Sequence, residues 1–311
     1  MNMNLFLWLI IFIIALIALV KSATIFTRYS EKLGHVLGMP QFMVGVLIVA
    51  IGTSLPELAT SLASVWHHET GMVAGNVLGT VIANILLGLG LAAIFSKRII
   101  KMKWDISFGD LPLYVGAIIL VVFTMLDGIL TWKEALFFLL GYIIYFYYSL
   151  ETNHKNKKVS REKFNWSILI FIAISLVMVI FASDWVVKSI IEMATILGFG
   201  TSVLATSFIA IGTSLPEISV ALAAVRRGNY DLLIGNIIGS NIFDIFVIFG
   251  LSGLVSPLNI PQTITSLVIP AIIATSILYW VVTSDKKITR TEGVLMVLVY
   301  LLFLGKLFDF I

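Results

Sequence analysis

Three acidic side chains lie deep within long apolar stretches of this 311-residue chain: Glu57, Glu217 and Asp244. An unpaired ionised carboxylate at membrane depth costs at least about 2.5–3.5 kcal/mol. The same stretches contain no lysine or arginine that could neutralise these acids. The acids are therefore either protonated or accompanied by another cation, and a bound metal ion is the simplest source of that charge.

Each glutamate ends the motif Gly-Thr-Ser-Leu-Pro-Glu, at residues 52–57 and 212–217. Proline lacks a backbone N–H and clashes with the carbonyl four residues earlier, so the motif predicts a break in an apolar helix. The break is expected to release backbone carbonyls near Ala50 and Ala210, close to hydroxyl and carboxyl groups. Hard cations such as Ca²⁺ and Na⁺ prefer oxygen ligands of these kinds. The two motifs therefore predict two parts of one oxygen-lined cation site.

Polar residues also recur every four positions in two further apolar stretches, so that each set shares one helix face. They are Asn76, Thr80 and Asn84 in the first stretch, and Asn236, Ser240 and Asp244 in the second. For Asn76 and Asn236, ligation and helix–helix hydrogen bonding are both open roles. Since position 84 is neutral where position 244 is acidic, the complete site carries up to three negative charges. That charge fits one divalent ion or up to three monovalent ions. The glycine pairs at 75 and 79 and at 235 and 239 are expected to let helices pack closely.

The sequence repeats itself with an offset of 160 residues. Residues 50–57 and 210–217 are identical, and the same offset relates Gly75-Asn76 to Gly235-Asn236. With five apolar spans in each half, the second half enters the membrane from the opposite side, which predicts an inverted repeat with its site near the midplane. The predicted parts are a first five-helix repeat at 1–150, a polar cytoplasmic linker at 151–165 and a second repeat at 166–311. The repeated motifs occupy about 42–95 and 202–254.

The composition independently predicts a membrane protein. Hydrophobic residues make up 59% of the chain and charged residues 12%, with a mean hydropathy of +1.06. This excludes a soluble enzyme domain and a nucleic-acid-binding chain. The absence of cysteine excludes disulfides and thiolate sites. The predicted fold is an all-α polytopic membrane protein with ten transmembrane helices. The spans lie near 4–26, 42–65, 72–95, 111–126, 132–150, 166–188, 202–225, 232–254, 264–283 and 291–310.

The basic residues predict the orientation of these spans. With the N-terminus outside, 17 of the 20 lysines and arginines fall in inner loops or at inner helix ends. Basic residues favour the cytoplasmic side of a membrane. We therefore expect a multi-pass protein of the cell membrane with both termini outside.

At these motifs the chain closely resembles the Ca²⁺:cation antiporter superfamily, in particular its prokaryotic Na⁺/Ca²⁺ exchanger branch. The duplicated Gly-Thr-Ser-Leu-Pro-Glu, with a downstream Gly-Asn-x-x-Gly-Ser/Thr, corresponds to the two α-repeats of that family. The resemblance implies Na⁺-driven Ca²⁺ exchange by alternating access, in which the first and sixth helices slide across the others. The implied ion ligands, with the alanines acting through backbone carbonyls, are Ala50, Thr53, Ser54, Glu57, Thr80, Asn84, Ala210, Thr213, Ser214, Glu217, Ser240 and Asp244.

The first repeat departs from the family pattern at Thr80-Val81, where the family usually has serine and often asparagine, as in Ser240-Asn241. Within transport, a Ca²⁺/H⁺ antiporter and a K⁺-dependent Na⁺/Ca²⁺ antiporter are the alternatives. An intramembrane enzyme is disfavoured because no histidine or lysine lies beside the buried serines. A passive channel is disfavoured because three carboxylates would hold ions too tightly for fast conduction. We expect Ca²⁺, Na⁺ and the lipid bilayer as partners, with no cofactor, no nucleic acid and no obligatory protein partner.

Overall fold

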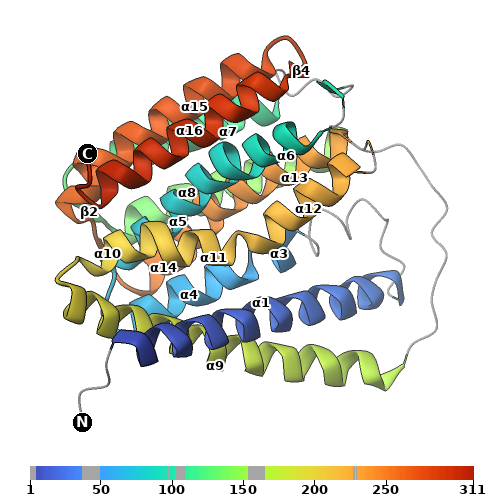
Figure 1. The fold of residues 1–311 in the computed structure, drawn as a ribbon. Coiled ribbons are helices and arrows are strands. Elements are labelled where there is room, and N and C mark those ends of the chain that lie inside the picture. The colour runs from blue at the N-terminus through green and yellow to red at the C-terminus, as the bar shows by residue number, and fades with distance from the viewer. Residues whose placement is uncertain are drawn as a thin grey trace.

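The computed structural model describes residues 5–36, 50–96, 98–102, 109–152, 165–226, 228 and 230–311, and almost all of them are helical (Figure 1). Residues 42–49 of the second predicted span and most of the predicted linker lie outside these ranges. The helices of residues 1–152 are α1 (Leu5–Val36), α3 (Ala50–Thr53), α4 (Leu55–Trp66), α5 (Gly71–Ile82), the π-helix η2 (Ala83–Leu89), α6 (Gly90–Phe95), α7 (Asp110–Met125) and α8 (Trp132–Thr152).

The helices from residue 166 onward follow a similar order. They are α9 (Trp166–Leu197), α10 (Thr201–Leu204), η4 (Ala205–Ile209), α11 (Ala210–Thr213), α12 (Leu215–Arg226), α13 (Tyr230–Phe243), η5 (Asp244–Ile248), α14 (Phe249–Val255), η6 (Ile264–Val268), α15 (Ile269–Thr283) and α16 (Arg290–Leu307). Among the described residues, five helices are long and apolar enough to cross a membrane, or six if the bent pair α11–α12 with its preceding turns counts as one span. The helix α7 is apolar but has only 16 residues.

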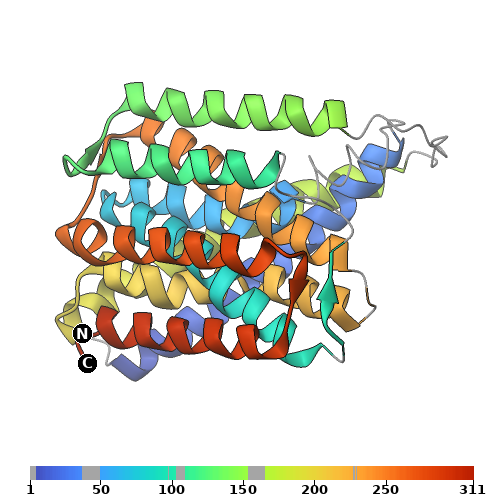
Figure 2. The same cartoon turned by 90° about the horizontal axis from the view of Figure 1, so that it is seen from above.

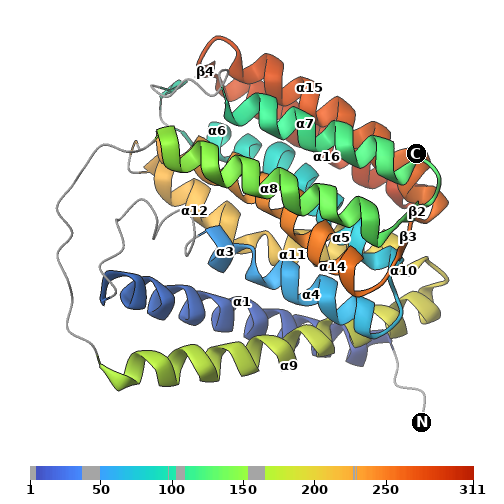
Figure 3. The same ribbon diagram turned by 180° about the vertical axis from the view of Figure 1, so that it is seen from behind.

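The helices α1 and α9 form a layer of their own. They lie side by side in opposite directions along one face of the molecule, and α15 and α16 lie on the opposite face (Figures 1 and 3). The inner side of this layer packs against α4 through buried residues such as Leu19 and Val186. Its outer side exposes large apolar side chains, including Ile14 and Phe181. Exposed apolar surface of this extent suits contact with lipid.

The two halves of the chain pack into each other. The helix α6 of the first half packs against α16 of the second, and α14 of the second half packs against α8 of the first. Two short antiparallel strand pairs also join the halves: β1 (Ile100–Lys101) with β4 (Lys287–Ile288), and β2 (Ile129–Leu130) with β3 (Leu258–Asn259). These strand pairs lie at opposite ends of the helical bundle (Figure 2).

Close helix packing at the first predicted glycine pair is confirmed. A Cβ atom at Gly75 would lie 2.5 Å from the carbonyl oxygen of Ser202, and one at Gly79 would collide with the carbonyl oxygen of Thr206. Both contacts join α5 to the α10–η4 segment of the other half. For Gly235 and Gly239, the segment related to 202–206 by the repeat offset is 42–46, which lies outside the described residues.

We expect Gly79→Ala to destabilise the protein by about 1–3 kcal/mol, because an added methyl group must push the two helix backbones apart. The measurement is the thermal unfolding midpoint in detergent. Gly116→Ala is the matched control, since an added Cβ at Gly116 of α7 would have no atom of another described segment within 4 Å. The control should be neutral or more stable, because alanine restricts the unfolded chain and favours a helix. Equal melting temperatures for Gly79→Ala and the wild type would contradict the close contact.

Candidate cation site

Both repeated motifs form a broken helix, as their prolines predict. The break in the first half is at Ser54, between α3 and α4, and the break in the second is at Ser214, between α11 and α12. The second helix pair is bent by 41°. Glu57 and Glu217 lie in the first turns of α4 and α12. The N-terminus of a helix carries partial positive charge, so each break favours the acid placed beside it.

The predicted ligands are buried. The side chain of Ala50 is outside the described set, and every other predicted ligand is at most 9% exposed: Thr53, Ser54, Glu57, Thr80, Asn84, Ala210, Thr213, Ser214, Glu217, Ser240 and Asp244. Both carboxyl oxygens of Glu57, Glu217 and Asp244 lack a hydrogen-bond partner among the described residues. Buried oxygens without partners are costly, so the site requires protons or a cation.

The acids of the two halves interact with each other. Glu57 and Glu217 are close enough for mutual electrostatic repulsion, and each is also repelled by Asp244. Threonine side chains also lie next to acids of the opposite half. Thr213 lies next to the carboxyl group of Glu57, and Thr53 lies next to that of Glu217. Residues separated by about 160 positions therefore share one buried polar region.

The acids do not meet at a single point. Within the part of the chain that the structure describes, no three His, Asp or Glu side chains are close enough together to hold one metal ion. A cation near any one carboxyl group would therefore take most of its ligands from hydroxyl, amide and carbonyl oxygens. Ser54 provides one of these, because its hydroxyl oxygen is buried and lies beside Asp244.

Two π-helical segments position the remaining polar ligands. Asn84 is the second residue of η2, and Asp244 is the first residue of η5. The segment η2 packs against α12 and α13, whereas η5 packs against α4 and α5. Each π segment therefore brings its ligand to the broken helix of the other half. Such wide turns often occur at functional sites.

The expectation of a released carbonyl at Ala210 is wrong for this conformation. The carbonyl oxygen of Ala210 accepts hydrogen bonds from the backbone N–H of Ser214 at 3.1 Å and from its Oγ at 2.6 Å. Ser214 keeps backbone angles in the right-handed helical region, so the bond four residues back survives the break. The N–H that Pro216 lacks would have served Gly212 instead.

The structure distinguishes the two asparagines whose roles the sequence left open. The Asn76 amide donates to the carbonyl oxygen of Glu57 at 3.1 Å and to the hydroxyl oxygens of Thr60 and Ser61 at 3.0 Å each. Asn76 therefore joins α5 to α4. The amide nitrogen of Asn236 has no such partner in the described residues. The positions equivalent to 60 and 61 are valine and alanine in the second half, which explains the difference.

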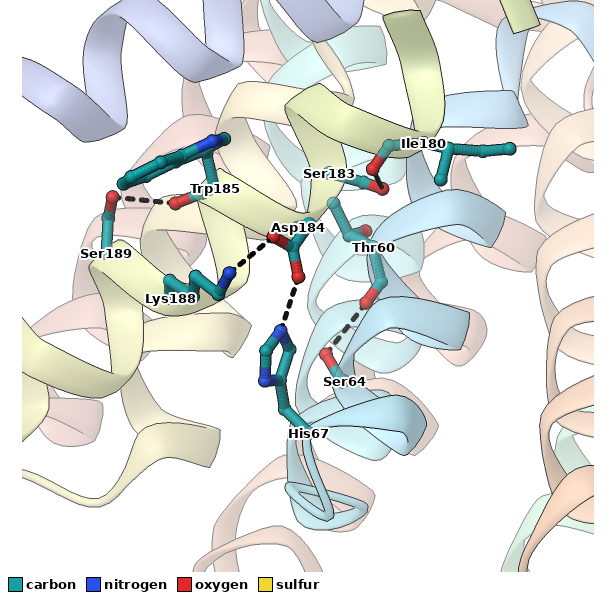
Figure 4. Close-up of polar contacts among 9 residues, drawn as sticks. All are labelled: Thr60, Ser64, His67, Ile180, Ser183, Asp184, Trp185, Lys188 and Ser189. Atoms are coloured by element: carbon teal, nitrogen blue, oxygen red, sulfur yellow. Dashed lines mark hydrogen bonds and ion pairs between the residues drawn. The ribbon is translucent and has the colours of Figure 1, made fainter. Parts of the chain in front are cut away.

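A second polar cluster lies at the far end of α4. Asp184 of α9 contacts the His67 ring nitrogen Nε2 at 2.6 Å and the Lys188 Nζ at 2.7 Å (Figure 4). These side chains are 21–44% exposed, in contrast to the buried acids. Elsewhere along the described α4–α9 contact, hydroxyl groups such as those of Ser64 and Ser183 donate within their own helix. No repeated motif of the sequence indicates this cluster.

Comparison with known proteins identifies the family. The sequence model of the family described as "Sodium/calcium exchanger protein" matches residues 7–151 and 167–308. The chain belongs to this family. The sodium/calcium exchanger MaX1 of Methanosarcina acetivorans is 30% identical, over 96% of this chain and 98% of MaX1. The inner membrane protein YrbG of Escherichia coli is 31% identical, over 79% of each chain. The family membership and the apolar helices make the chain a multi-pass membrane protein.

Solved structures give the same assignment. The sodium–calcium exchanger NCX_Mj, in crystals soaked with Na⁺ and Sr²⁺, superimposes with a TM-score of 0.67 at 29% identity, over 95% of this chain and 97% of NCX_Mj. The H⁺/Ca²⁺ exchanger CAX superimposes with a TM-score of 0.76 at 17% identity, over 95% of this chain and 81% of CAX. CAX shares the fold. The prediction that the family is one of transporters and not of enzymes is confirmed by these relatives.

Proposed function

We propose that this chain is a secondary antiporter that exchanges Na⁺ for Ca²⁺ across the membrane by alternating access. One observation carries the proposal: three buried carboxyl groups from both halves interact without hydrogen-bond partners among the described residues. MaX1 and NCX_Mj are sodium/calcium exchangers, and this similarity supports the choice of ions. The transported ions are the only ligands we propose, and no cofactor is needed.

The proposed cation site uses the twelve oxygen-bearing positions inferred from the sequence. Hydroxyl and amide oxygens surround the three acids, and the carbonyls of Ala50 and Ala210 complete the set. At Ala210 this requires the Ser214 hydroxyl to turn from the carbonyl toward the ion. The Ser214 hydroxyl and one lone pair of the Ala210 carbonyl oxygen then become available to the cation together, while the backbone hydrogen bond from Ser214 to Ala210 is kept.

We propose ten transmembrane helices in two inverted repeats, at 1–150 and 166–311, joined by a cytoplasmic linker. Several paired features support this plan. The helices α1 and α9 each contain 32 residues. The helices α8 and α16 each begin at a Thr-x-x-Glu capping box, formed by Thr131 with Glu134 and by Thr289 with Glu292. The two strand pairs are also equivalent under the repeat. In each pair, one strand follows the third predicted span of one half, and the other strand precedes the fifth span of the other half.

Alternating access is proposed to occur by movement of the α1–α9 layer across the remaining helices. The α4–α9 contact supports this, because the described hydroxyl groups along it donate within their own helices, and the His67–Asp184 contact at the end of α4 would have to break for α9 to slide. His67 and Asp184 fall near the outer ends of their predicted spans, and they are in contact. This contact agrees with the predicted alternation of the spans, which puts both residues on the same side of the membrane.

The test is Ca²⁺ uptake into proteoliposomes of the purified full-length chain, driven by an outward Na⁺ gradient at constant pH. We expect uptake that depends on the Na⁺ gradient and stops when the gradient is dissipated. The Ca²⁺/H⁺ alternative, which the shared fold of CAX makes worth testing, predicts uptake driven by a pH gradient without Na⁺. Uptake that requires K⁺ would indicate the K⁺-dependent alternative. No gradient-driven uptake under any of these conditions would overturn the proposal.

We expect Asn84→Asp to favour Ca²⁺ over Na⁺ by roughly tenfold or more, because two unit charges 4 Å apart interact by about 4 kcal/mol at an effective dielectric constant of 20. A divalent ion gains twice as much as a monovalent ion from the added charge. The measurement is the competition of Na⁺ with Ca²⁺ uptake. Asn259→Asp adds the same charge at an exposed strand and should leave the competition unchanged. Unchanged selectivity in Asn84→Asp would place position 84 outside the cation site.

A further inference from the structure

Two differences between the repeats occur on the same pair of helices. Position 84 is asparagine where position 244 is aspartate, and position 81 is valine where position 241 is asparagine. Each pair is related by the offset of 160. The sequence motif alone gives no reason why these two differences should occur together.

The structure brings the two asparagines of these positions, Asn84 and Asn241, into contact. The Asn84 amide nitrogen Nδ2 donates a hydrogen bond to the Asn241 oxygen Oδ1 at 3.1 Å. Both side chains are 1% exposed, so bulk water does not reach this bond in this conformation. The other end of the Asn84 amide, the oxygen Oδ1, is buried without a hydrogen-bond partner in the described residues. The hydrogen bond therefore fixes the amide nitrogen, and the amide oxygen can accept a ligand.

An amide must be held in one orientation to bind a cation, whereas a carboxylate need not be. A primary amide has one end that can bind a cation and one end, the NH₂ group, that repels it. A carboxylate has two equivalent acceptor oxygens, so it can bind a cation whichever way it turns. An asparagine in a cation site therefore requires an acceptor that fixes its NH₂ group, whereas an aspartate does not. Asn241 provides this acceptor for Asn84, and Asp244 has only Val81 at the equivalent position.

We propose that Asn241 is a positioning residue that orients the Asn84 amide so that its oxygen, and not its nitrogen, faces the transported cation. The inference rests on the proposed exchange function and goes beyond its ligand set. It also explains why the two differences occur together: the neutral ligand at 84 depends on the asparagine at 241. The valine at 81 suffices where the ligand is Asp244.

The test is a double-mutant cycle in proteoliposomes with Na⁺-driven Ca²⁺ uptake as the measurement. Asn241→Val copies the residue at the equivalent position of the first repeat and removes the acceptor. In the Asn84 background we expect it to raise the KM for Ca²⁺ about tenfold, which corresponds to about 1.4 kcal/mol. In the Asn84→Asp background we expect less than about a twofold change, because a carboxylate needs no such orientation.

Two controls separate this role from a structural one. Ser252→Val removes another buried side chain whose hydroxyl lacks a partner in the described residues, and it should leave the KM unchanged. If Asn241→Val does not fold, Asn241→Leu keeps the shape of asparagine and takes its place in the cycle. An equal rise of the KM in both backgrounds, or no rise in either, would overturn the positioning role. Absent uptake by the wild type would instead overturn the exchange function.

Discussion

Replacing Glu57 or Glu217 by glutamine is expected to reduce Na⁺-driven Ca²⁺ uptake to the background of protein-free liposomes. Each substitution removes one of three buried charges while keeping nearly the same shape. The fold should survive, because both oxygens of each glutamate lack hydrogen-bond partners among the described residues, and a neutral amide is less costly to bury. Uptake and the thermal unfolding midpoint should be measured on the same preparations.

Glu192→Gln is the matched control, since Glu192 is an exposed acid on α9 and its substitution should leave transport intact. Wild-type uptake by Glu57→Gln or Glu217→Gln would remove that residue from the ion pathway. A loss of both uptake and stability would mean that the glutamate supports the helix break. The pairing of lost uptake with an unchanged melting temperature is therefore the result that the cation site predicts.

Cross-linking His67 to Asp184 is expected to stop exchange completely. The chain contains no cysteine, so His67→Cys with Asp184→Cys can be linked by a short bifunctional thiosulfonate without other reactive thiols. The two side chains are 2.6 Å apart at their nearest atoms; His67 directly follows α4, and Asp184 lies on α9. If α9 must move relative to α4, the link should arrest uptake and a reducing agent should restore it.

The control pair is Glu69→Cys with Thr201→Cys. These side chains are joined by a hydrogen bond of 2.7 Å close to His67, but they connect α10 to the turn before α5 and leave α9 free. Linking them should preserve most of the uptake, since the proposed sliding does not separate them. Full exchange by the His67–Asp184 cross-linked protein would show that α9 keeps its place against α4 during transport.

The sequence predicted those parts of the site that depend on local chemistry. Proline at 56 and 216 predicts helix breaks, and the breaks occur at Ser54 and Ser214. Acids in apolar stretches predict a buried charged site, and Glu57, Glu217 and Asp244 are buried together. These features follow from one residue type in one environment, so no knowledge of the packing is needed.

The remaining features depend on contacts between helices. No pattern in the sequence indicates the π-helical segments that carry Asn84 and Asp244, because the polar residues there recur at the four-residue spacing of an ordinary helix. The Asn84–Asn241 bond joins residues 157 positions apart. The substitution of the usual asparagine by Val81 was visible as a departure from the family pattern. The reason for this departure becomes apparent only from the contact between Asn84 and Asn241 on the opposing helix.

The packing of α6 on α16 and of α14 on α8 has a consequence for assembly. Gly90 of α6 lies against the backbone of Gly293, and Gly250 of α14 lies against Ala135 and Leu139. Each half thus provides the surface on which the last helix of the other half rests. During synthesis α8 cannot pack against α14 until the second half has been inserted, so the first half cannot complete its packing alone. The two halves are interlocked, and separately expressed fragments should become stable only when both are present.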